Sequence, residues 1–274
     1  MHNAGYGPKE PVVKILAIGD VFGSPGLRAV QKWLPRLKEE LEASLVVVNV
    51  ENLHGGRGAD PAGVRDILLA GADVLTSGNH IWGHRSHTKL LESEPRLLRP
   101  ANYPTPCPGR GVGVFNTIEG LRVGVVNLMG RIFLQPVDDP FGIAEEIIGQ
   151  LDGRCEAVVV DFHAEATSEK LALATVLDGK AAAVFGTHTH VQTADARLLP
   201  GGTGFITDLG MTGPYDSVIG METAAAIKRF RTARPVRNIP ASGGIGLRGA
   251  LFDVDEATGH CHGVTRVSRG AGGE

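Results

Sequence analysis

The chain has 274 residues, enough to bury a substantial core and to form one α/β domain, which we expect over residues 12–268. Its formal net charge of −3 argues against a protein that coats long nucleic acid, because such binding needs a basic face. No apolar run approaches the ~20 residues of a membrane span, and the three cysteines form no C-x-x-C pair. We therefore expect a cytoplasmic protein with no membrane anchor, a disordered extension at 1–11 and a flexible tail at 269–274.

Short apolar runs alternate with amphipathic segments along most of the chain, which predicts an α/β fold. We expect strands over residues 12–19, 45–50, 73–77, 111–118, 121–128, 156–162, 181–186, 204–207, 246–254 and 260–267. We expect helices over residues 25–41, 61–70, 168–177 and 222–231 and a loop followed by a helix over 138–151, and Pro35 should kink or split the first helix. Turn residues at 119–120 and 256–259 predict two hairpins, over 111–128 and 246–267.

Several of the expected strands end at a polar residue that can bind a metal. These residues are Asp20, Glu51, Asn79, His163, His188 and His190. Taken singly, each has an ordinary structural explanation, such as a helix cap for Asp20 or a turn for Asn79. In open α/β sheets, however, sites form beyond the carboxyl ends of the strands, so six such residues at equivalent places predict one shared site.

The pair His188 and His190 has a spacing of two residues. On an extended backbone both imidazoles would point to one face, as metal ligands must, whereas two surface histidines are the alternative. Mixed imidazole, carboxylate and amide ligands suit Fe, Mn, Zn or Co better than Mg or Ca. The number of ligands favours two ions about 3.5–4 Å apart, with Glu51 as the bridge, and an anionic substrate such as a phosphoester.

Three other patterns could suggest sites. Residues 244–249 match G-x-G-x-x-G but lead into a strand, so a dinucleotide site is not expected. The histidines at 260 and 262 lie in the second expected hairpin with no third ligand, which favours a surface strand. The glycines at 55–58 could offer N–H groups to a phosphate or simply form a flexible turn.

The motifs Gly19-Asp20, Glu51-Asn52, Gly78-Asn79-His80, His163 and 186–190 resemble those of the calcineurin-like metallophosphoesterases. The resemblance is closer to the YmdB-like bacterial 2′,3′-cyclic-nucleotide phosphodiesterases, and the stretches 99–102, 161–170 and 208–216 extend it over almost the whole chain. It implies a four-layer α/β/β/α sandwich with two divalent metal ions, Fe or Mn first and Zn, Mg or Co as alternatives.

The resemblance also implies roles for individual residues. Asp20, Glu51, Asn52 and His190 would hold one metal ion, and Glu51, Asn79, His163 and His188 would hold the other. A hydroxide bridging the two ions would attack the phosphorus of a 2′,3′-cyclic nucleotide, with 2′,3′-cyclic AMP as the expected substrate. His80 would be the proton donor to the leaving oxygen.

The sequence departs from the family pattern at three places. Phe22 stands where the wider superfamily has a histidine ligand, so Asn52 would replace that ligand. Gly83 stands where an aspartate is usual, which leaves open what orients His80. Leu53-His54 replaces a pair of residues that is expected to be small. His54 and Gly56 are weak candidates for substrate contacts, with a solvated loop histidine and a plain turn as the alternatives.

Two other functions remain open at this point. The chain could be a metal-binding regulatory protein with weak hydrolysis, for which Gly83 is the supporting feature, or a phosphomonoesterase or nucleotidase on the same scaffold. The expected partner is a small cyclic nucleotide, with no stable complex with long nucleic acid and no membrane. A homo-oligomer is left open.

Overall fold

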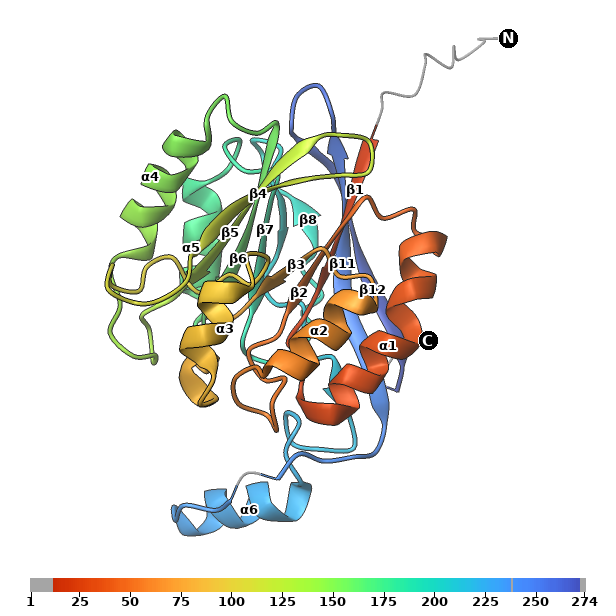
Figure 1. The fold of residues 1–274 in the computed structure, drawn as a ribbon, viewed down its shortest axis with the longest axis vertical. Helices are drawn as coiled ribbons and strands as arrows, with labels where there is room; N and C mark the ends of the chain where they lie inside the picture. The colour runs from red at the N-terminus through yellow and green to blue at the C-terminus, as the bar shows by residue number, and fades with distance from the viewer. Residues whose placement is uncertain (1–11, 238, 272–274) are drawn as a thin grey trace.

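The computed structural model describes residues 12–237 and 239–271, so the extension expected at 1–11 lies outside the described residues. Two β-sheets lie face to face and helices cover their outer sides (Figure 1). Within the described residues, no helix combines the length and the apolar character needed to cross a bilayer.

The first sheet has the strand order β10-β11-β1-β2-β3, and β12 pairs with β11. Its strands are β1 (Val12–Ile18), β2 (Leu45–Asn49), β3 (Val74–Thr76), β10 (Gly213–Pro214), β11 (Ile245–Asp255) and β12 (Cys261–Gly270). The first three run parallel, while β11 is antiparallel to β1, β10 and β12. The hairpin expected over 246–267 is confirmed as β11 and β12, and β12 extends two residues into the segment expected to be a tail.

The second sheet has the order β4-β5-β6-β7-β9-β8. Its strands are β4 (Val112–Asn116), β5 (Arg122–Met129), β6 (Ala157–His163), β7 (Ala183–Thr187), β8 (Arg197–Leu198) and β9 (Gly204–Ile206). The middle strands run parallel, and antiparallel β4 and β8 form the two edges. The hairpin expected over 111–128 is confirmed as β4 and β5.

The helices are α1 (Gly23–Glu40), α2 (Pro61–Leu69), α3 (His87–Ser93), α4 (Pro140–Leu151), α5 (Thr167–Val176) and α6 (Thr223–Thr232), with a 3₁₀ helix, η1 (Ile81–Gly83). Asp60 and Asp139 cap α2 and α4 by accepting backbone N–H groups, and a proline follows each cap at the first helical position. Pro35 does not split α1, which is continuous from Gly23 to Glu40. The sequence did not predict η1, α3, β8 or β10.

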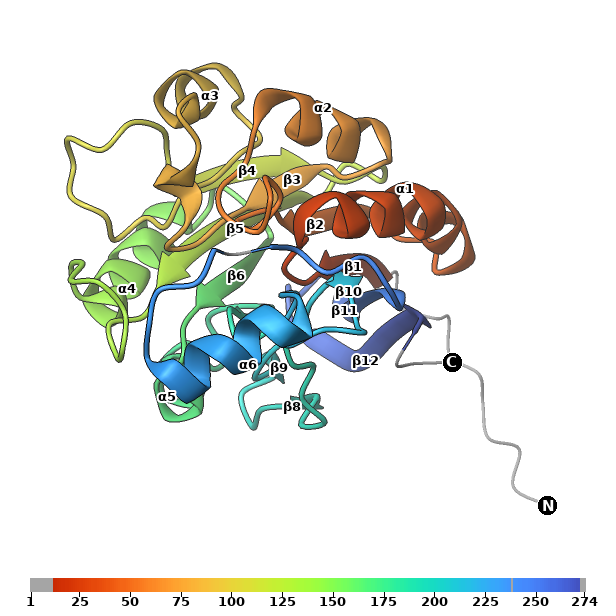
Figure 2. The same ribbon diagram turned by 90° about the horizontal axis from the view of Figure 1, so that it is seen from below.

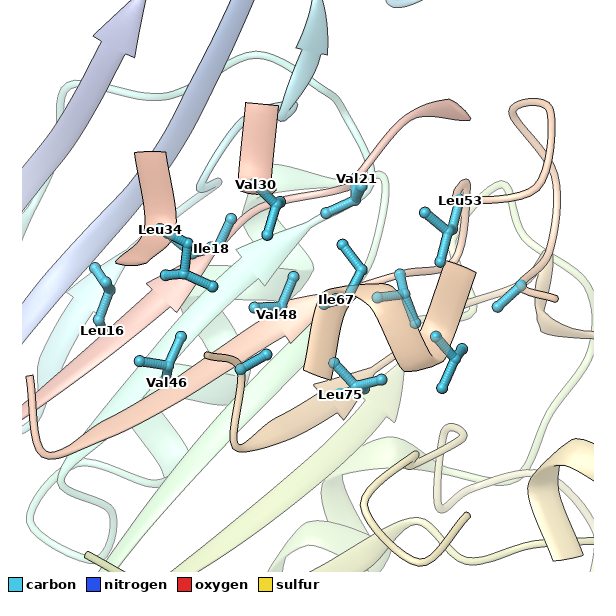
Figure 3. Close-up of a cluster of buried hydrophobic side chains, with 14 of the residues drawn as sticks. Leu16, Ile18, Val21, Val30, Leu34, Val46, Val48, Leu53, Ile67 and Leu75 are labelled. Carbon is cyan, nitrogen blue, oxygen red and sulfur yellow. The ribbon is translucent and has the colours of Figure 1, made fainter. Parts of the chain in front are cut away.

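Three buried apolar clusters hold the layers together. In β1, Leu16 and Ile18 face α1 and α2, while Ile15 and Ala17 face the second sheet, as strand alternation requires. Figure 3 shows the first cluster, in which Leu34 of α1 packs over the strands. The third cluster joins the second sheet to α4 and α5. Full burial of each aliphatic side chain contributes about 1.5–3 kcal/mol. The four-layer α/β/β/α arrangement is therefore confirmed.

The parallel strands of both sheets end at one edge of the sandwich. Figure 2 looks onto this edge and shows α6 lying across it, in front of the sheets. The residues that follow β1, β2, β3, β6 and β7 are thus brought together there, and this edge carries the candidate site.

Candidate metal centre

Two buried carboxylates lie at the centre of this edge. Asp20 follows β1 and Glu51 follows β2, and their exposed fractions are 0% and 1%. The backbone N–H of His188 donates to Oδ2 of Asp20 at 3.1 Å. Among the described residues, Oδ1 of Asp20 and Oε1 of Glu51 accept no hydrogen bond although both are fully buried. Burying carboxylate oxygens without a partner is costly, so these two atoms indicate a place for cations.

Glu51 faces two imidazoles and an amide. Nε2 of His163 lies 3.1 Å from Oε2 of Glu51, 3.0 Å from Oδ1 of Asn79 and 3.0 Å from Nδ1 of His188. One ring nitrogen carries at most one hydrogen and cannot satisfy all three neighbours. The ligand atoms of Glu51, His163 and His188 lie within 4.8 Å of one another, so this arrangement fits a cation.

The other ring nitrogen of His163 is fixed by a hydrogen-bond chain. Thr187 donates from Oγ1 to Oδ1 of Asp161 at 2.7 Å, so Thr187 accepts from Nδ1 of His163, 2.9 Å away. Asn49 and Thr76 also donate to Asp161. A neutral His163 therefore carries its proton on Nδ1 and directs the lone pair of Nε2 at the centre, as outer hydrogen bonds commonly arrange for metal ligands.

A second group of ligand atoms lies around His190. Nδ1 of His190 donates to the carbonyl of Ile219 at 2.8 Å, which leaves Nε2 facing Oδ1 of Asn52 at 3.2 Å. The Nδ2 group of Asn52 donates to the carbonyl of Gly56 at 3.1 Å and so fixes the amide in this orientation. Phe22 contacts His190 edge-on, with ring centroids 5.5 Å apart, at the position where the wider superfamily has a histidine.

The geometry of His188 and His190 differs from the sequence prediction. Both residues lie beyond the end of β7 and have positive φ angles of 103° and 66°, so the expected extended backbone is wrong. Positive φ angles are uncommon for non-glycine residues, and those held under strain cluster at functional sites. Because of this turn His188 faces His163, while His190 faces Asn52. Nε2 of His188 also lies 3.1 Å from Oε2 of Glu165, a residue that the sequence analysis missed.

Gly78 makes the close approach of these side chains feasible. A Cβ atom at this position would lie 2.3 Å from Oε2 of Glu51 and 2.3 Å from Nε2 of His163. Any larger residue would therefore push the ligands apart. The donor set consists of two carboxylates, two amide oxygens and three imidazoles, and it fits divalent first-row metals.

Burial and the neighbouring charges shift the pKa values of four side chains in the cluster. Burial raises the pKa of Asp20 to about 6, against the opposing effect of His190 and His163. Burial also acts to raise the pKa of Glu51, but the contact with His163 outweighs it and holds that pKa well below its usual value. Burial disfavours charge on His163, yet Glu51 raises its pKa to about 9. Burial and the neighbouring charge of His163 lower the pKa of His188 to about 3.

His80 lies at the rim of the centre, with 31% of its side chain exposed. Its backbone N–H donates to Oε2 of Glu51 at 3.1 Å, and its Nδ1 lies 3.0 Å from Nδ2 of Asn52 and 3.3 Å from Oε1 of Glu51. A Cβ atom at Gly83 would lie 2.7 Å from Cγ of Arg57, so the packing leaves no room for an aspartate. Nδ2 of Asn52 and the hydrogen bond from the backbone N–H of His80 to Glu51, rather than residue 83, orient His80.

The remaining candidates lie outside the centre. Nδ1 of His54 pairs with Oδ2 of Asp60 at 3.1 Å beside the cap of α2, and half of the His54 side chain is exposed. Gly56 donates its N–H to the carbonyl of Asn52 at 3.0 Å, so this group is already committed within the turn. The G-x-G-x-x-G match lies at the start of β11, and His262 is exposed on β12.

A sandwich of two sheets with carboxylates, amides and histidines at the strand ends defines a metallophosphoesterase. The family model of the YmdB-like proteins matches residues 16–267, and the chain belongs to this family. It is 45% identical over 255 residues to a Bacillus subtilis protein named 2′,3′-cyclic-nucleotide 2′-phosphodiesterase, covering 93% of this chain and 96% of that one.

Two solved structures are similar to this one. A Thermus thermophilus protein described as hypothetical superposes with a TM-score of 0.89 at 41% identity, covering 94% of this chain and 100% of that one. A Mycoplasma pneumoniae protein described as a novel phosphatase superposes with a TM-score of 0.90 at 33% identity, covering 96% and 95%. These values support the same fold over nearly the full length of each chain.

Proposed function

We propose that this protein hydrolyses 2′,3′-cyclic nucleotides with two divalent metal ions. The observation that carries the proposal is a pair of buried carboxylate oxygens, on Asp20 and Glu51, that accept no hydrogen bond from the described residues and are surrounded by imidazole and amide ligands. The name of the Bacillus subtilis relative supports the substrate class. Among such substrates, 2′,3′-cyclic AMP is the one we would test first.

Asp20, Glu51, Asn52 and His190 would hold one ion, and Glu51, Asn79, His163 and His188 the other. This division is supported by the contact of His190 with Asn52 and by that of His188 with His163. When bound, divalent ions supply positive charge toward the phosphoryl oxygens and lower the pKa of water. Fe and Mn are the ions we propose, since both accept nitrogen and oxygen ligands.

His80 would protonate the leaving oxygen. The oxygen of water would add to phosphorus with loss of one proton to solvent, and the bond between phosphorus and O2′ would break. O2′ would take a proton from Nε2 of His80, so that the product carries a 3′-phosphate and a free 2′-hydroxyl, and His80 would regain its proton from solvent. Nε2 holds a proton in the neutral ring because Nδ1 accepts from Nδ2 of Asn52. A ribose alkoxide is a poor leaving group, so proton donation in this position accelerates its departure.

The proposal is tested with purified protein loaded with Mn or Fe and assayed on 2′,3′-cyclic AMP. Glu51→Ala should lose both ions in elemental analysis and lose turnover. The matched variant Glu92→Ala, at an exposed site on α3, should keep the two ions and the turnover. Full metal content in Glu51→Ala would contradict the bridging role. The assay includes a nucleoside monophosphate, since faster release of phosphate from it would favour a phosphomonoesterase.

We also propose a cytoplasmic location for the protein. The three cysteines, Cys107, Cys155 and Cys261, are all free thiols, as expected in a reducing compartment. The proposed partner is a small cyclic nucleotide, and the regulatory alternative would be favoured if metal-loaded protein turned over no phosphodiester faster than the free ions do.

A further inference from the structure

Helix α6 is an arm that stands away from the rest of the molecule. It is anchored at its base, where Glu222 donates its N–H to the carbonyl of Ile239 and Met221 bridges to Pro240. Beyond that base none of the helix residues is buried, and Phe230 has an exposed fraction of 80%. Most helices owe their stability to packing of an apolar face, so this arm is built for contact with another molecule.

The arm is strongly basic, although the chain as a whole is slightly acidic. Residues 223–237 contain five basic residues and no acidic one. These residues are Lys228, Arg229, Arg231, Arg234 and Arg237. Within 12–237 and 239–271, no carboxylate forms an ion pair with any of the five. An uncompensated cluster of this kind indicates a polyanionic ligand.

A hollow of about 770 Å³ lies between the arm and the loop that follows β2. Arg229, Phe230 and Arg234 line it from the side of the arm, and Arg57 lines it from the body. Three guanidinium groups around one exposed aromatic ring are the combination that binds single-stranded nucleic acid, since the cations pair with phosphates and the ring stacks on a base.

The chain segments that line this hollow also contact residues of the metal centre. Arg57 lies six residues after Glu51 and packs against Gly83, three residues after His80. On the other side, the carbonyl of Ile219 fixes His190, and α6 starts four residues later. Figure 2 shows α6 crossing the edge where the parallel strands end. The hollow therefore opens on the same edge of the sandwich as the metal centre.

We propose that the hollow binds the end of a single-stranded oligoribonucleotide, so that its terminal 2′,3′-cyclic phosphate reaches the metal centre. The inference rests on the proposed hydrolysis of cyclic phosphates and names RNA 3′ ends as a substrate class. The nucleotides before the end would bind to Arg229, Arg234 and Arg57 and stack on Phe230. A few contacts of this kind give a short, salt-sensitive complex rather than coating of long RNA.

The charge and shape of the hollow favour this occupant over a lipid surface or a second copy of the chain. A membrane-binding helix needs a broad apolar face, whereas Ile227 and Phe230 are the two large apolar side chains within α6. A second copy of the chain carries a net negative charge, but that charge is not concentrated in one strand. A nucleic acid strand carries one phosphate per nucleotide and so presents a row of anions to the basic residues of the arm.

Binding is tested by fluorescence anisotropy with full-length, Mn-loaded protein and a 5′-labelled oligoribonucleotide of about eight nucleotides that ends in a 3′-phosphate. The double variant Arg229→Ala/Arg234→Ala should weaken binding at least about tenfold and reduce the salt slope by about 1.4. Phe230→Ala should weaken binding about fivefold or more. The matched variant Lys228→Ala/Arg231→Ala removes the same charge from the same helix outside the hollow and should change binding less than about twofold.

Turnover separates this inference from the proposed function. The kcat/KM for the same oligonucleotide ending in a 2′,3′-cyclic phosphate is compared with that for 2′,3′-cyclic AMP. The ratio of kcat/KM for the oligonucleotide to kcat/KM for 2′,3′-cyclic AMP should fall about tenfold in the hollow variant, Arg229→Ala/Arg234→Ala. It should stay constant in the matched variant, Lys228→Ala/Arg231→Ala. If the wild-type protein hydrolyses the mononucleotide but neither binds nor hydrolyses the oligonucleotide, the inference fails while the proposed function stands. If it hydrolyses neither, the proposed function fails.

Three further results would overturn the inference. An equal loss of binding in both double variants would mean that general charge, not the hollow, attracts RNA. Binding to phosphatidylglycerol vesicles that depends on Arg229 and Arg234, without binding to RNA, would make the arm a lipid-binding element. A change of mass in light scattering for the hollow variant alone would identify a second copy of the chain as the occupant.

Discussion

Nδ2 of Asn52 lies 3.0 Å from Nδ1 of His80, so the amide of a proposed metal ligand also sets the tautomer of the proposed proton donor. A second hydrogen bond fixes the orientation of that amide, since the same Nδ2 donates to the carbonyl of Gly56. The amide oxygen is thereby left for the metal centre beside His190. The side chain of Asn52 thus contacts both the metal centre and the proton donor. The variants Asn52→Asp and His80→Ala can separate these two roles.

The first prediction concerns Asn52→Asp, which keeps the shape of the side chain and replaces the Nδ2 donor by an acceptor. His80 must then carry its proton on Nδ1, and Nε2 has none to give in the neutral ring. We expect kcat on 2′,3′-cyclic AMP to fall about 10²-fold with metal content unchanged. Asn116→Asp, at an exposed position on β4, is the control. Unchanged kcat in Asn52→Asp would show that the amide does not set the tautomer.

The second prediction concerns His80→Ala. Loss of the proton donor should lower kcat on 2′,3′-cyclic AMP about 10²-fold or more, because the ribose oxygen leaves unprotonated. A bis-nitrophenyl phosphodiester should be affected much less, since nitrophenolate leaves without a proton. Both substrates are measured with the same protein, and His262→Ala on β12 serves as the matched control. An equal loss on both substrates would assign His80 to binding rather than to proton donation.

The positions of the ligands along the chain could be predicted because each lies at or just beyond the end of a short buried strand. β1, β2, β6 and β7 each contain a run of apolar residues, so the polar residues at the end of each strand stand out in the sequence. Parallel pairing then brings those residues to one edge. The same signal is absent for β8 and β10, which have two residues each and show no periodicity.

The contacts that orient the ligands could not be predicted in this way. Glu165 reaches His188 from the loop after β6, and the carbonyl of Ile219 reaches His190 from a loop 29 residues further along the chain. Backbone carbonyls carry no sequence signature, and Glu165 lies among other polar residues. The positive φ angles of His188 and His190 depend on packing beyond β7, so the extended geometry expected from their spacing was wrong although both reach the centre.

The third prediction is that His188 and His190 belong to different ions. His188 contacts His163, and His190 contacts Asn52, so each replacement should weaken one position. His188→Ala and His190→Ala should each retain about one of two ions in elemental analysis. Spectroscopy of the retained Mn should differ between the two variants because the remaining ligands differ. Loss of the same ion in both variants would contradict the division.

The fourth prediction concerns the pH dependence of metal binding. Glu51 raises the pKa of His163 to about 9 in the metal-free protein, so at lower pH a cation must displace the proton on Nε2. Affinity for Mn²⁺ should therefore rise with pH and level off above about 9. Burial raises the pKa of Asp20 to about 6, so a second proton competes below that pH. The low pKa of His188, about 3, means that this ring adds no further proton.

Calorimetric titration with Mn²⁺ in buffers of different ionisation enthalpy measures directly how many protons are released when the cation binds. Between pH 7 and 8, binding should release about one proton, and below pH 6 the number should rise further because Asp20 is then protonated as well. Because Glu51 causes the raised pKa of His163, Glu51→Gln should reduce the release at pH 7.5 even where residual Mn²⁺ binding is detected. Release that is zero at pH 7.5 in the unaltered protein would show that His163 is already neutral and that its ion pair with Glu51 does not form.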